Sequence, residues 1–317
     1  MLTVFMATSN REQILRDVLE HYCRLEQPSG AWKLVVIDNG STDRTAQVVT
    51  SFTHRIPVQY LVEQLPGKNA ALNTGLDLLE GDLAVFTDDD VFPHANWLVE
   101  LRRAADSNPS YSIFGGAVVP RWESPPPDWI RWIDLGPVYT LTEPSWKEGP
   151  VDVSVVFGPN MAIRSSIFES GMRFNPSIGP RGKSYPMGSE TEMVLRIASQ
   201  GHQAWHVPGA IVEHFIRKEQ LQKRWVWGRA VRYGRGQYRL SAGGKENAVE
   251  FAGAPVYLYI DMFRKIVRLV VALLFFRGEY LFRSFWYLNF RRGELIEARN
   301  MTRERRERSK SVPHAVA

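Results

Sequence analysis

The densest group of reactive side chains in this sequence is Asp88-Asp89-Asp90, which follows the apolar residues 83–86 directly. A short apolar run is typical of a strand buried on both faces, and adjacent aspartates are poor strand formers, so the strand should end there. Carboxylates this close repel one another unless a cation or hydrogen bonds compensate them. Hard divalent cations such as Mg2+ and Mn2+ prefer these oxygen ligands. The alternative interpretation is an acidic turn at the surface.

Strand-like and helix-like segments alternate through the first ninety residues, and they would position these aspartates. Apolar runs typical of buried strands lie at residues 3–7, 34–37 and 83–86, and residues 57–62 are expected to form a further strand. Segments with a helical period, such as residues 14–25, separate them. This alternation predicts a parallel sheet with helices on its faces. Polar loops that follow the strands would then share one crevice at the carboxyl edge of the sheet.

The second hundred residues are less regular. We predict a strand over 113–119, a long aromatic loop over 122–146, a strand over 153–163 with a break at Gly158-Pro159, a Gly-rich polar loop over 177–189, a helix over 190–198 and a last strand over 203–207. Long loops in compact domains often carry function.

Eight short motifs follow one another in an order that resembles a known family. They are Thr8-Ser9-Asn10-Arg11, Val36 to Asp43, Gly67 to Gly75, Gly81-Asp82, Phe86 to Asp90, Gly158 to Ile163, Gly188 to Met193, and Val207 to His214. Together they resemble the family 2 glycosyltransferases with the GT-A fold, over residues 1–216.

The resemblance implies an α/β fold, a Rossmann-like and mostly parallel sheet flanked by helices, with a C-terminal helical extension. Residues 1–100 would form the nucleotide-sugar half and residues 101–216 the acceptor half. The implied activity is metal-dependent, inverting transfer of a sugar from a nucleotide diphosphate sugar to a hydroxyl of a glycan or lipid-linked acceptor, as in bacterial cell-surface polysaccharide synthesis.

The same resemblance implies the donor contacts. Thr8 and Asn10 would line the base pocket, and Asp38 would accept hydrogen bonds from the base or ribose, as suits a carboxylate. The alternative for Asp38 is closing the Asn39-Gly40 turn. Lys68 begins a helix after a glycine and suits a phosphate contact, with a solvated lysine as the alternative.

The acidic run supplies the remaining donor and metal contacts in this resemblance. Asp88 would contact the ribose or the metal, Asp89 joins the nucleotide-sugar contacts, and Asp90 would bind Mn2+ or Mg2+. Alternation along an extended segment would put Asp88 and Asp90 on one face and Asp89 on the other. His214 would complete the metal site, with a purely structural histidine as the alternative and His206 as a competitor.

An inverting transfer needs one carboxylate to take the proton of the acceptor hydroxyl. Many relatives have Glu-Asp before the helix at 190–198, whereas this chain has Ser189-Glu190, so Glu190 falls at the position of the catalytic Asp. Ser189 and Glu192 also have the spacing of a capping box, which would give Glu192 a structural role. We therefore expect Glu190 to be the base.

The last hundred residues are basic and aromatic, and they dominate the net charge of +5. Residues 217–239 suit binding of the donor diphosphate, with a solvated basic helix as the alternative. Residues 256–292 mix apolar, aromatic and basic positions. This pattern is typical either of helices at an anionic membrane surface or of a helical pair packed on protein. Residues 217–300 would form this extension, and 301–317 are expected to be disordered.

Composition excludes several classes of protein. The single Cys23 excludes an internal disulfide and a cysteine-rich zinc site, and it fits a reducing compartment. The N-terminus has no basic region before its apolar run, so we expect no signal peptide and a cytoplasmic protein, peripheral at the inner face of the cell membrane. The basic tail has no recognisable nucleic-acid module behind it, so no nucleic-acid partner is expected.

Two other functions remain as alternatives. A sugar nucleotidyltransferase would need a Gly-rich basic loop after the first strand, and Thr8 to Glu12 contains no glycine. A catalytically silent membrane-associated scaffold would be expected to lose its acidic motifs, whereas Asp38, the aspartate run and Glu190 are all present.

Overall fold

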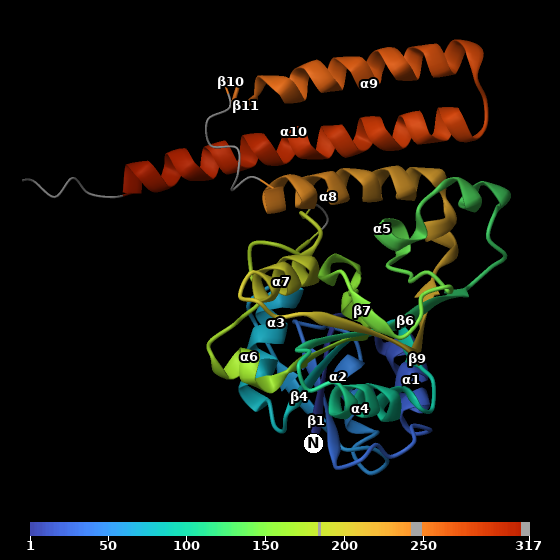
Figure 1. Cartoon of the computed structure of the whole chain (residues 1–317), viewed down its shortest axis with the longest axis vertical. Helices are drawn as coiled ribbons and strands as arrows, with labels where there is room; N and C mark the ends of the chain where they lie inside the picture. The colour runs from blue at the N-terminus through green and yellow to red at the C-terminus, as the bar shows by residue number, and fades with distance from the viewer. Residues whose placement is uncertain (183–184, 242–248, 312–317) are drawn as a thin grey trace, which may run out of the picture. The chain divides into compact units, whose positions relative to one another are not determined.

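The structure, a computed structural model, describes residues 1–182, 185–241 and 249–311 and divides into two compact units (Figure 1). The first unit comprises Met1–Pro125, Leu135–Gly182 and Ser189–Arg217. The second comprises Pro126–Asp134, Lys183–Gly188 and Lys218–Ala317. Residues 126–134 thus belong with the C-terminal helices, although the sequence had placed them in the domain 1–216.

The first unit is built on a nine-stranded sheet in the order β3-β2-β1-β4-β8-β6-β9-β5, with β7 paired to β9. Strands β1 to β4 are parallel neighbours, whereas β8 runs antiparallel to both β4 and β6. The sheet is therefore mixed, with its parallel half at the N-terminus. The strands are β1 (Leu2–Thr8), β2 (Trp32–Asp38), β3 (Val58–Val62), β4 (Leu83–Asp88), β5 (Val91–Pro93), β6 (Ile113–Trp122), β7 (Gly149–Val151), β8 (Met161–Arg164) and β9 (Ala204–Ile216).

The helices of the first unit connect these strands. They are α1 (Glu12–Tyr22), α2 (Thr45–Thr50), α3 (Lys68–Gly75), η1 (Leu76–Leu78), α4 (Trp97–Ser107), α5 (Leu135–Tyr139), η3 (Val153–Val155), η4 (Gly158–Asn160), α6 (Ser165–Glu169) and α7 (Ser189–Ala198), where η marks a 3-10 helix.

Strands β1, β2 and β4 are buried on both faces, as their continuous apolar sequences predict, whereas the edge strand β3 is partly exposed. On one face, Phe5 and Phe86 stack within a core formed with α3, α6 and α7. Alternate residues of the strands point the other way. There, Tyr22 of α1 packs between Trp32 of β2 and Trp97 of α4. The sheet is thus covered on both sides, and only its edges and loops are left for chemistry.

The structure corrects one strand and confirms one loop. Residues 153–160, expected to begin a strand, form the 3-10 helices η3 and η4, and only 161–164 enter the sheet. The aromatic segment 122–146 is the expected loop with short helical turns. The Gly-rich segment 177–189 is irregular up to the start of α7 at Ser189, apart from residues 183–184, which lie outside the described residues.

The second unit contains η2 (Asp128–Trp132), η5 (Lys218–Leu221), α8 (Lys223–Ser241), β10 (Glu250–Phe251), β11 (Ala254–Pro255), α9 (Val256–Phe275) and α10 (Glu279–Ser311). Helix α10 lies between α8 and α9 (Figure 1). It includes residues 301–311, where disorder was expected, while 312–317 lie outside the described residues. Among the helices described, none combines the length and the apolar character needed to cross a membrane.

Glycines let α8 and α10 pack closely. A Cβ atom added at Gly234 would lie 2.0 Å from the carbonyl oxygen of Phe290, and one at Gly293 would lie 2.1 Å from that of Val231. The close contact is fixed by the fully buried carboxylate of Glu297, which accepts hydrogen bonds from Nε of Arg235 at 2.8 Å and of Arg239 at 2.5 Å. Two of the basic residues of 217–239 therefore have a structural role.

The amide of Asn160 ties strands β6 and β9 to α4. It is fully buried and accepts a hydrogen bond from Nε1 of Trp97 at 2.8 Å. It also donates to the carbonyl oxygens of Ala117 at 2.9 Å and Ala210 at 2.7 Å. These two acceptors lie on β6 and β9, at the irregularity in their pairing. The asparagine of the Gly-Pro-Asn motif is thus a structural residue.

We expect Asn160→Ala to lower the free energy of unfolding by roughly 3 kcal/mol, because it leaves a buried indole N–H and two carbonyls without their partner. Urea unfolding followed by circular dichroism measures this change. The control is Gln47→Ala, which removes an exposed amide from α2. An Asn160→Ala midpoint as close to wild type as that of the control would contradict the structural role.

Candidate active site

The carboxyl ends of β1, β2 and β4 meet at one edge of the sheet, as expected. Thr8 is in register with Asp38, and Ala7 is in register with Asp88. These strands end at Thr8, Asp38 and Asp88 themselves. The polar residues singled out in three separate motifs are therefore neighbours at one edge.

Asp38 is buried, and both of its carboxylate oxygens have partners. Oδ1 accepts a hydrogen bond from the backbone N–H of Ser41 at 2.8 Å, so Asp38 does close its own turn. Oδ2 accepts a hydrogen bond from the hydroxyl of Tyr60 at 2.6 Å. Burial is the main cause that raises the pKa of Tyr60 above its usual range, and the carboxylate of Asp38 adds to the rise. The phenol of Tyr60 therefore stays a hydrogen-bond donor. Each carboxylate oxygen can accept a second hydrogen bond, which leaves Asp38 able to contact a ligand.

Thr8 and Asn10 hold the loops at this edge in place. The Thr8 hydroxyl donates to Asp89 at 2.8 Å. Asn10 adopts a left-handed backbone conformation with φ of 54°, which asparagine tolerates better than most residues. Its side-chain oxygen accepts from the backbone N–H of Thr42 at 2.8 Å, and its own backbone N–H donates to Ser41 at 2.8 Å. The loops after β1 and β2 are therefore tied together.

The three aspartates contact different partners from those that strand alternation predicts. β4 ends at Asp88, and Asp89 and Asp90 form a turn before β5. Consequently Asp88 contacts Lys68, whereas Arg11 lies near both others, with its Nε 3.8 Å from Asp89 and its Nη2 3.9 Å from Asp90. The expected grouping of Asp88 with Asp90 was wrong, because the segment is not extended there.

Asp89 has an unusual ionisation. Burial is the main cause that raises its pKa, to about 7, and the neighbouring Asp90 acts in the same direction. Arg11 and the Thr8 hydroxyl act against this rise. Without a further cation, Asp89 is therefore partly protonated near neutral pH.

Lys68 links the acidic turn to α7. Its Nζ donates to Asp88 and, at 2.6 Å, to Oε1 of Glu190. Lys68 is thus an ion-paired residue rather than a solvated lysine. Burial alone would raise the pKa of Glu190, but the ammonium of Lys68, with hydrogen bonds from Lys68 and Ser189, lowers it to about 2. The two carboxylates in turn raise the pKa of Lys68, outweighing its burial.

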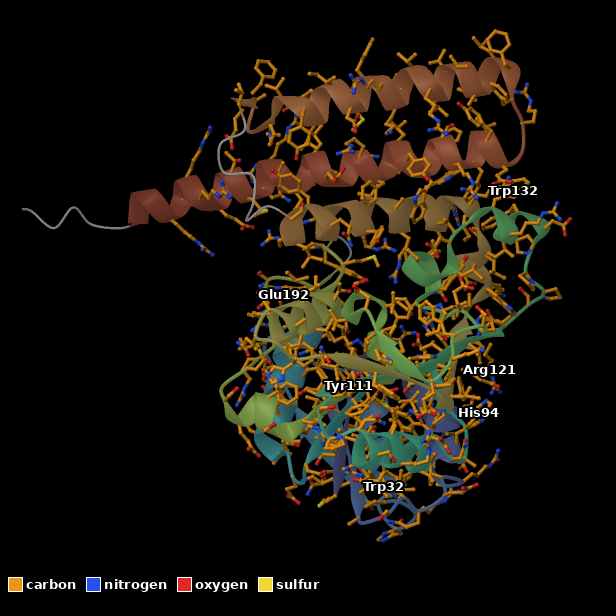
Figure 2. All side chains as sticks on the ribbon, viewed as in Figure 1. Trp32, His94, Tyr111, Arg121, Trp132 and Glu192 are labelled. Carbon is orange, nitrogen blue, oxygen red and sulfur yellow. The ribbon has the colours of Figure 1, made fainter. Side chains whose placement is uncertain are left out.

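Space for Glu190 comes from Gly158 of η4. A Cβ atom added at Gly158 would lie 2.5 Å from Cγ of Glu190, so only glycine leaves room for this side chain. Ser189 donates its hydroxyl to Oε2 of Glu190 at 2.5 Å. Glu192, labelled on α7 in Figure 2, instead forms an ion pair with Arg196 at 3.0 Å. The capping-box expectation was therefore wrong, because both of its side chains bond elsewhere.

His214 of β9 faces Asp90, with its Nε2 3.6 Å from Oδ1 of the aspartate. Its Nδ1 lies 2.7 Å from the carbonyl oxygen of Tyr139, and because a carbonyl only accepts, Nδ1 carries the proton. Nε2 is therefore the ring nitrogen of His214 that faces Asp90. The competing His206 is buried and packs edge-on against Trp146 instead.

A divalent cation fits between Asp90 and His214. The donor set combines a carboxylate with an imidazole whose other nitrogen is held by a carbonyl, the usual arrangement of a metal-binding histidine. Among the described residues, no three His, Cys, Asp or Glu side chains gather as a complete cage. Mg2+ commonly keeps several positions for water and substrate phosphates, so two protein ligands suffice for such a site.

Sequence reasoning missed two cations and the groups that orient His214. Arg11 lies near Asp89 and Asp90, and Nη1 of Arg217 lies 3.7 Å from Asp90. Arg11 was inside the first motif but was not assigned to the site. Arg217 was inside the basic segment 217–239, which was expected to bind the donor diphosphate, but its place beside Asp90 was not predicted. Tyr139 acts through its backbone in the aromatic loop, so no side-chain signal marked it.

Comparisons with known proteins show the family and the fold of this chain. The model of the family "Glycosyl transferase family 2" matches residues 3–171. The probable glycosyltransferase YdaM of Bacillus subtilis (strain 168) is 24% identical over 248 residues, which cover 74% of this chain. The chain spans about half of that relative, 54% of its length.

Two solved structures share the fold. The mannosyltransferase PcManGT from Pyrobaculum calidifontis, in complex with GDP-Man and Mn2+, has a TM-score of 0.58 at 17% identity, covering 95% of this chain and 86% of its own. TarS 1-349 of S. aureus, in complex with UDP-GlcNAc, has a TM-score of 0.53 at 14% identity, covering 97% and 92%. The chain therefore belongs to glycosyl transferase family 2 and has the GT-A fold.

Proposed function

We propose that this protein transfers a sugar from a nucleoside diphosphate sugar to a hydroxyl of a glycan or lipid-linked acceptor, with inversion and with Mn2+ or Mg2+ as cofactor. The observation that carries the proposal is the gathering of Asp88, Asp90 and Glu190 around Lys68, Arg11 and His214 at one sheet edge. The solved structures of similar fold hold UDP-GlcNAc in one case and GDP-Man with Mn2+ in the other, which supports the donor class and the metal.

Donor binding draws on the edge of β1, β2 and β4. Asp38 would accept hydrogen bonds from the base or ribose, beside the loop that holds Thr8 and Asn10. Asp88 and Asp89 follow at the end of β4, close to the ribose and diphosphate. Lys68, Arg11 and Arg217 would contact the diphosphate, since guanidinium and ammonium groups are the usual phosphate ligands.

Asp90 and Nε2 of His214 would hold the cation. A bound divalent cation neutralises the charge that develops on the departing diphosphate. The carbonyl of Tyr139 keeps His214 in the tautomer that binds a metal. Arg11 and Arg217 lie on the other carboxylate oxygen of Asp90, so they leave the oxygen beside His214 open.

Glu190 would act as the base. The acceptor oxygen attacks C1 of the donor sugar on the face opposite the diphosphate, which inverts that carbon. The bond between C1 and the phosphate oxygen breaks, and its electron pair stays on the diphosphate. The proton of the acceptor hydroxyl passes to the carboxylate of Glu190, which is ionised in the resting site.

Lys68 makes this base dependent on the donor. A carboxylate with a pKa of about 2 holds a proton poorly, and the ammonium of Lys68 is what keeps the pKa low. An incoming diphosphate competes with Glu190 for that ammonium. When Lys68 turns to the donor, the pKa of Glu190 rises toward the range in which a base works well.

We place this reaction in the cytoplasm, at the inner face of the cell membrane. The single Cys23 is free, which suits a reducing compartment. A lipid-linked acceptor would be met at the membrane surface.

One prediction concerns the dependence of donor hydrolysis on a divalent metal. We expect the purified protein to release nucleoside diphosphate from one nucleotide sugar of a panel when Mn2+ or Mg2+ is present, and EDTA to abolish the release. Asp90→Ala should lose roughly 100-fold or more, because it removes one of two metal ligands. Coupled detection of the released diphosphate measures the rate, and isothermal titration measures donor binding.

Matched variants on α7 test the base. Glu190→Gln should lower the transfer rate by roughly 10²- to 10⁴-fold, whereas Glu192→Gln, two residues on and paired with Arg196, should stay near wild type. EDTA-resistant release would sink the metal proposal. Absence of release together with absence of metal-dependent nucleoside diphosphate binding would overturn the transferase proposal itself.

The second prediction concerns pH. Lys68→Met leaves Glu190 buried without its ammonium, so the pKa of Glu190 should rise from about 2. Below its pKa the base is protonated and inactive, so the acid limb of kcat/KM should move to higher pH. Lys68→Arg keeps the charge and should keep the acid limb near that of wild type. A Lys68→Met profile with the same acid limb as Lys68→Arg would show that Lys68 does not set the ionisation of Glu190.

A further inference from the structure

Helix α9 of the second unit exposes its apolar face and turns most of its charged side chains toward α10, the reverse of a water-soluble amphipathic helix. Its outer stripe, defined here as residues spaced by three and four along the helix, is entirely apolar and exposed. The members are Ile260, Phe263, Val267, Val270 and Leu274, which are 49%, 66%, 45%, 50% and 68% exposed. The flanking Ile266, Leu273 and Phe275 are exposed as well.

The charges of α9 lie mostly on the opposite side, toward α10. The inner stripe has the same spacing and consists of Leu258, Asp261, Lys265, Arg268 and Ala272. Asp261 forms an ion pair with Arg291 of α10 at 2.6 Å. Lys265 lies over the ring of Tyr287, and Arg268 lies over the rings of Tyr280 and Tyr287. Leu258 and Ala272 are fully buried.

This arrangement is the reverse of what water favours, because a helix at a protein surface normally turns its charges to solvent. A contiguous apolar stripe of this length marks an interaction surface. Only one side of α9 is apolar, since its inner stripe is charged. A helix of this kind lies in the plane of an apolar boundary, with its apolar face buried among acyl chains.

The exposed charges indicate which apolar partner fits. On α9 and its link to α10, the exposed cations are Arg264 and Arg277. Arg264 lies 4.0 Å from Asp261, yet its side chain is 73% exposed. The exposed acid Glu279 is paired with Arg283 at 2.7 Å. A second copy of this helix would bring the same cations to the contact. Anionic lipid headgroups would bring the opposite charge, and a long arginine beside an apolar stripe can extend to them.

We propose that the outer stripe of α9 binds the surface of an anionic lipid bilayer, with Arg264 and Arg277 at the headgroups. The outer stripe is then the part of the protein that would hold it at the membrane. This proposal does not depend on glycosyl transfer. The stripe would insert Phe263, Val267 and Leu274 below the headgroups, while the ion pair between Asp261 and Arg291 stays on the protein side.

The test is flotation of the full chain with vesicles of phosphatidylcholine, with and without phosphatidylglycerol. We expect wild type to float with the anionic vesicles and to be released in part by high salt. Phe263→Glu with Leu274→Glu should weaken binding by roughly 100-fold or more, since two large apolar side chains no longer leave water. The control, Leu65→Glu with Leu195→Glu, adds the same charge at exposed leucines of the first unit and should float like wild type.

A second pair of variants separates charge from apolar burial. Arg264→Gln with Arg277→Gln should lose the preference for anionic vesicles. Circular dichroism must show that every variant is folded, which is expected because the substituted side chains are exposed.

Three results would overturn the inference. One is wild type that stays in the soluble fraction with anionic vesicles, and another is equal flotation of wild type and the Phe263/Leu274 variant. The third is a lipid-free dimer of wild type, seen by analytical ultracentrifugation, that this variant dissociates, since a second copy would then cover the stripe. Donor hydrolysis measured without vesicles reports on the active site separately, so failure of either proposal is distinguishable from failure of the other.

Discussion

The ammonium of Lys68 is the interaction on which the site depends. It joins carboxylates 20 residues and 122 residues away along the chain, Asp88 on β4 and Glu190 on α7. Removing one member of a buried ion pair leaves the other charge uncompensated, at a cost of roughly 3–5 kcal/mol. Lys68 is itself held by its place at the start of α3, where the N–H of the preceding Gly67 donates to Asn39 at 2.7 Å. The loop after β2 thus helps to position Glu190, the proposed base, on α7.

The parallel half of the fold could be predicted because its signals are local. Each strand from β1 to β4 is a short, mainly apolar run that is followed by polar residues. Strands β1, β2 and β4 are buried, whereas the edge strand β3 is partly exposed. Residues 153–157 are also apolar, yet they form a 3-10 turn, because an apolar run alone does not distinguish the two. The extension of α10 through residue 311 could not be predicted from the sequence either. Part of it is held by the pairing of Glu304 with Arg239 of α8, a contact between distant segments.

For the candidate site too, the position of residues along the elements could be predicted, whereas contacts between elements could not. Motifs placed Asp38 and Asp88 at the sheet edge, since parallel strands align their carboxyl ends. The family resemblance, and not the strand pattern, brought Glu190 of α7 to the same site. Orientation did not follow from the motifs, because it depends on partners from other elements. Strand alternation predicted that Asp89 and Asp90 would point to opposite faces, whereas both lie near Arg11. His214 is oriented by the backbone carbonyl of Tyr139, in the aromatic loop. Chain spacing carries no information about either contact.

The charges around Asp90 explain how a metal and a donor would enter together. Arg11 and Arg217 lie 3.9 and 3.7 Å from one carboxylate oxygen, longer than the 2.7–2.9 Å of a strong charge-assisted hydrogen bond. Both compensate the charge of the carboxylate, and under the proposed function both would be available to a donor diphosphate. A dication on the other oxygen, beside His214, would then replace their charge. Burial and the neighbouring Asp90 raise the pKa of Asp89 to about 7, and the same dication would favour its ionised form. In this proposal, metal, donor and the proton of Asp89 would be coupled through one turn of the chain.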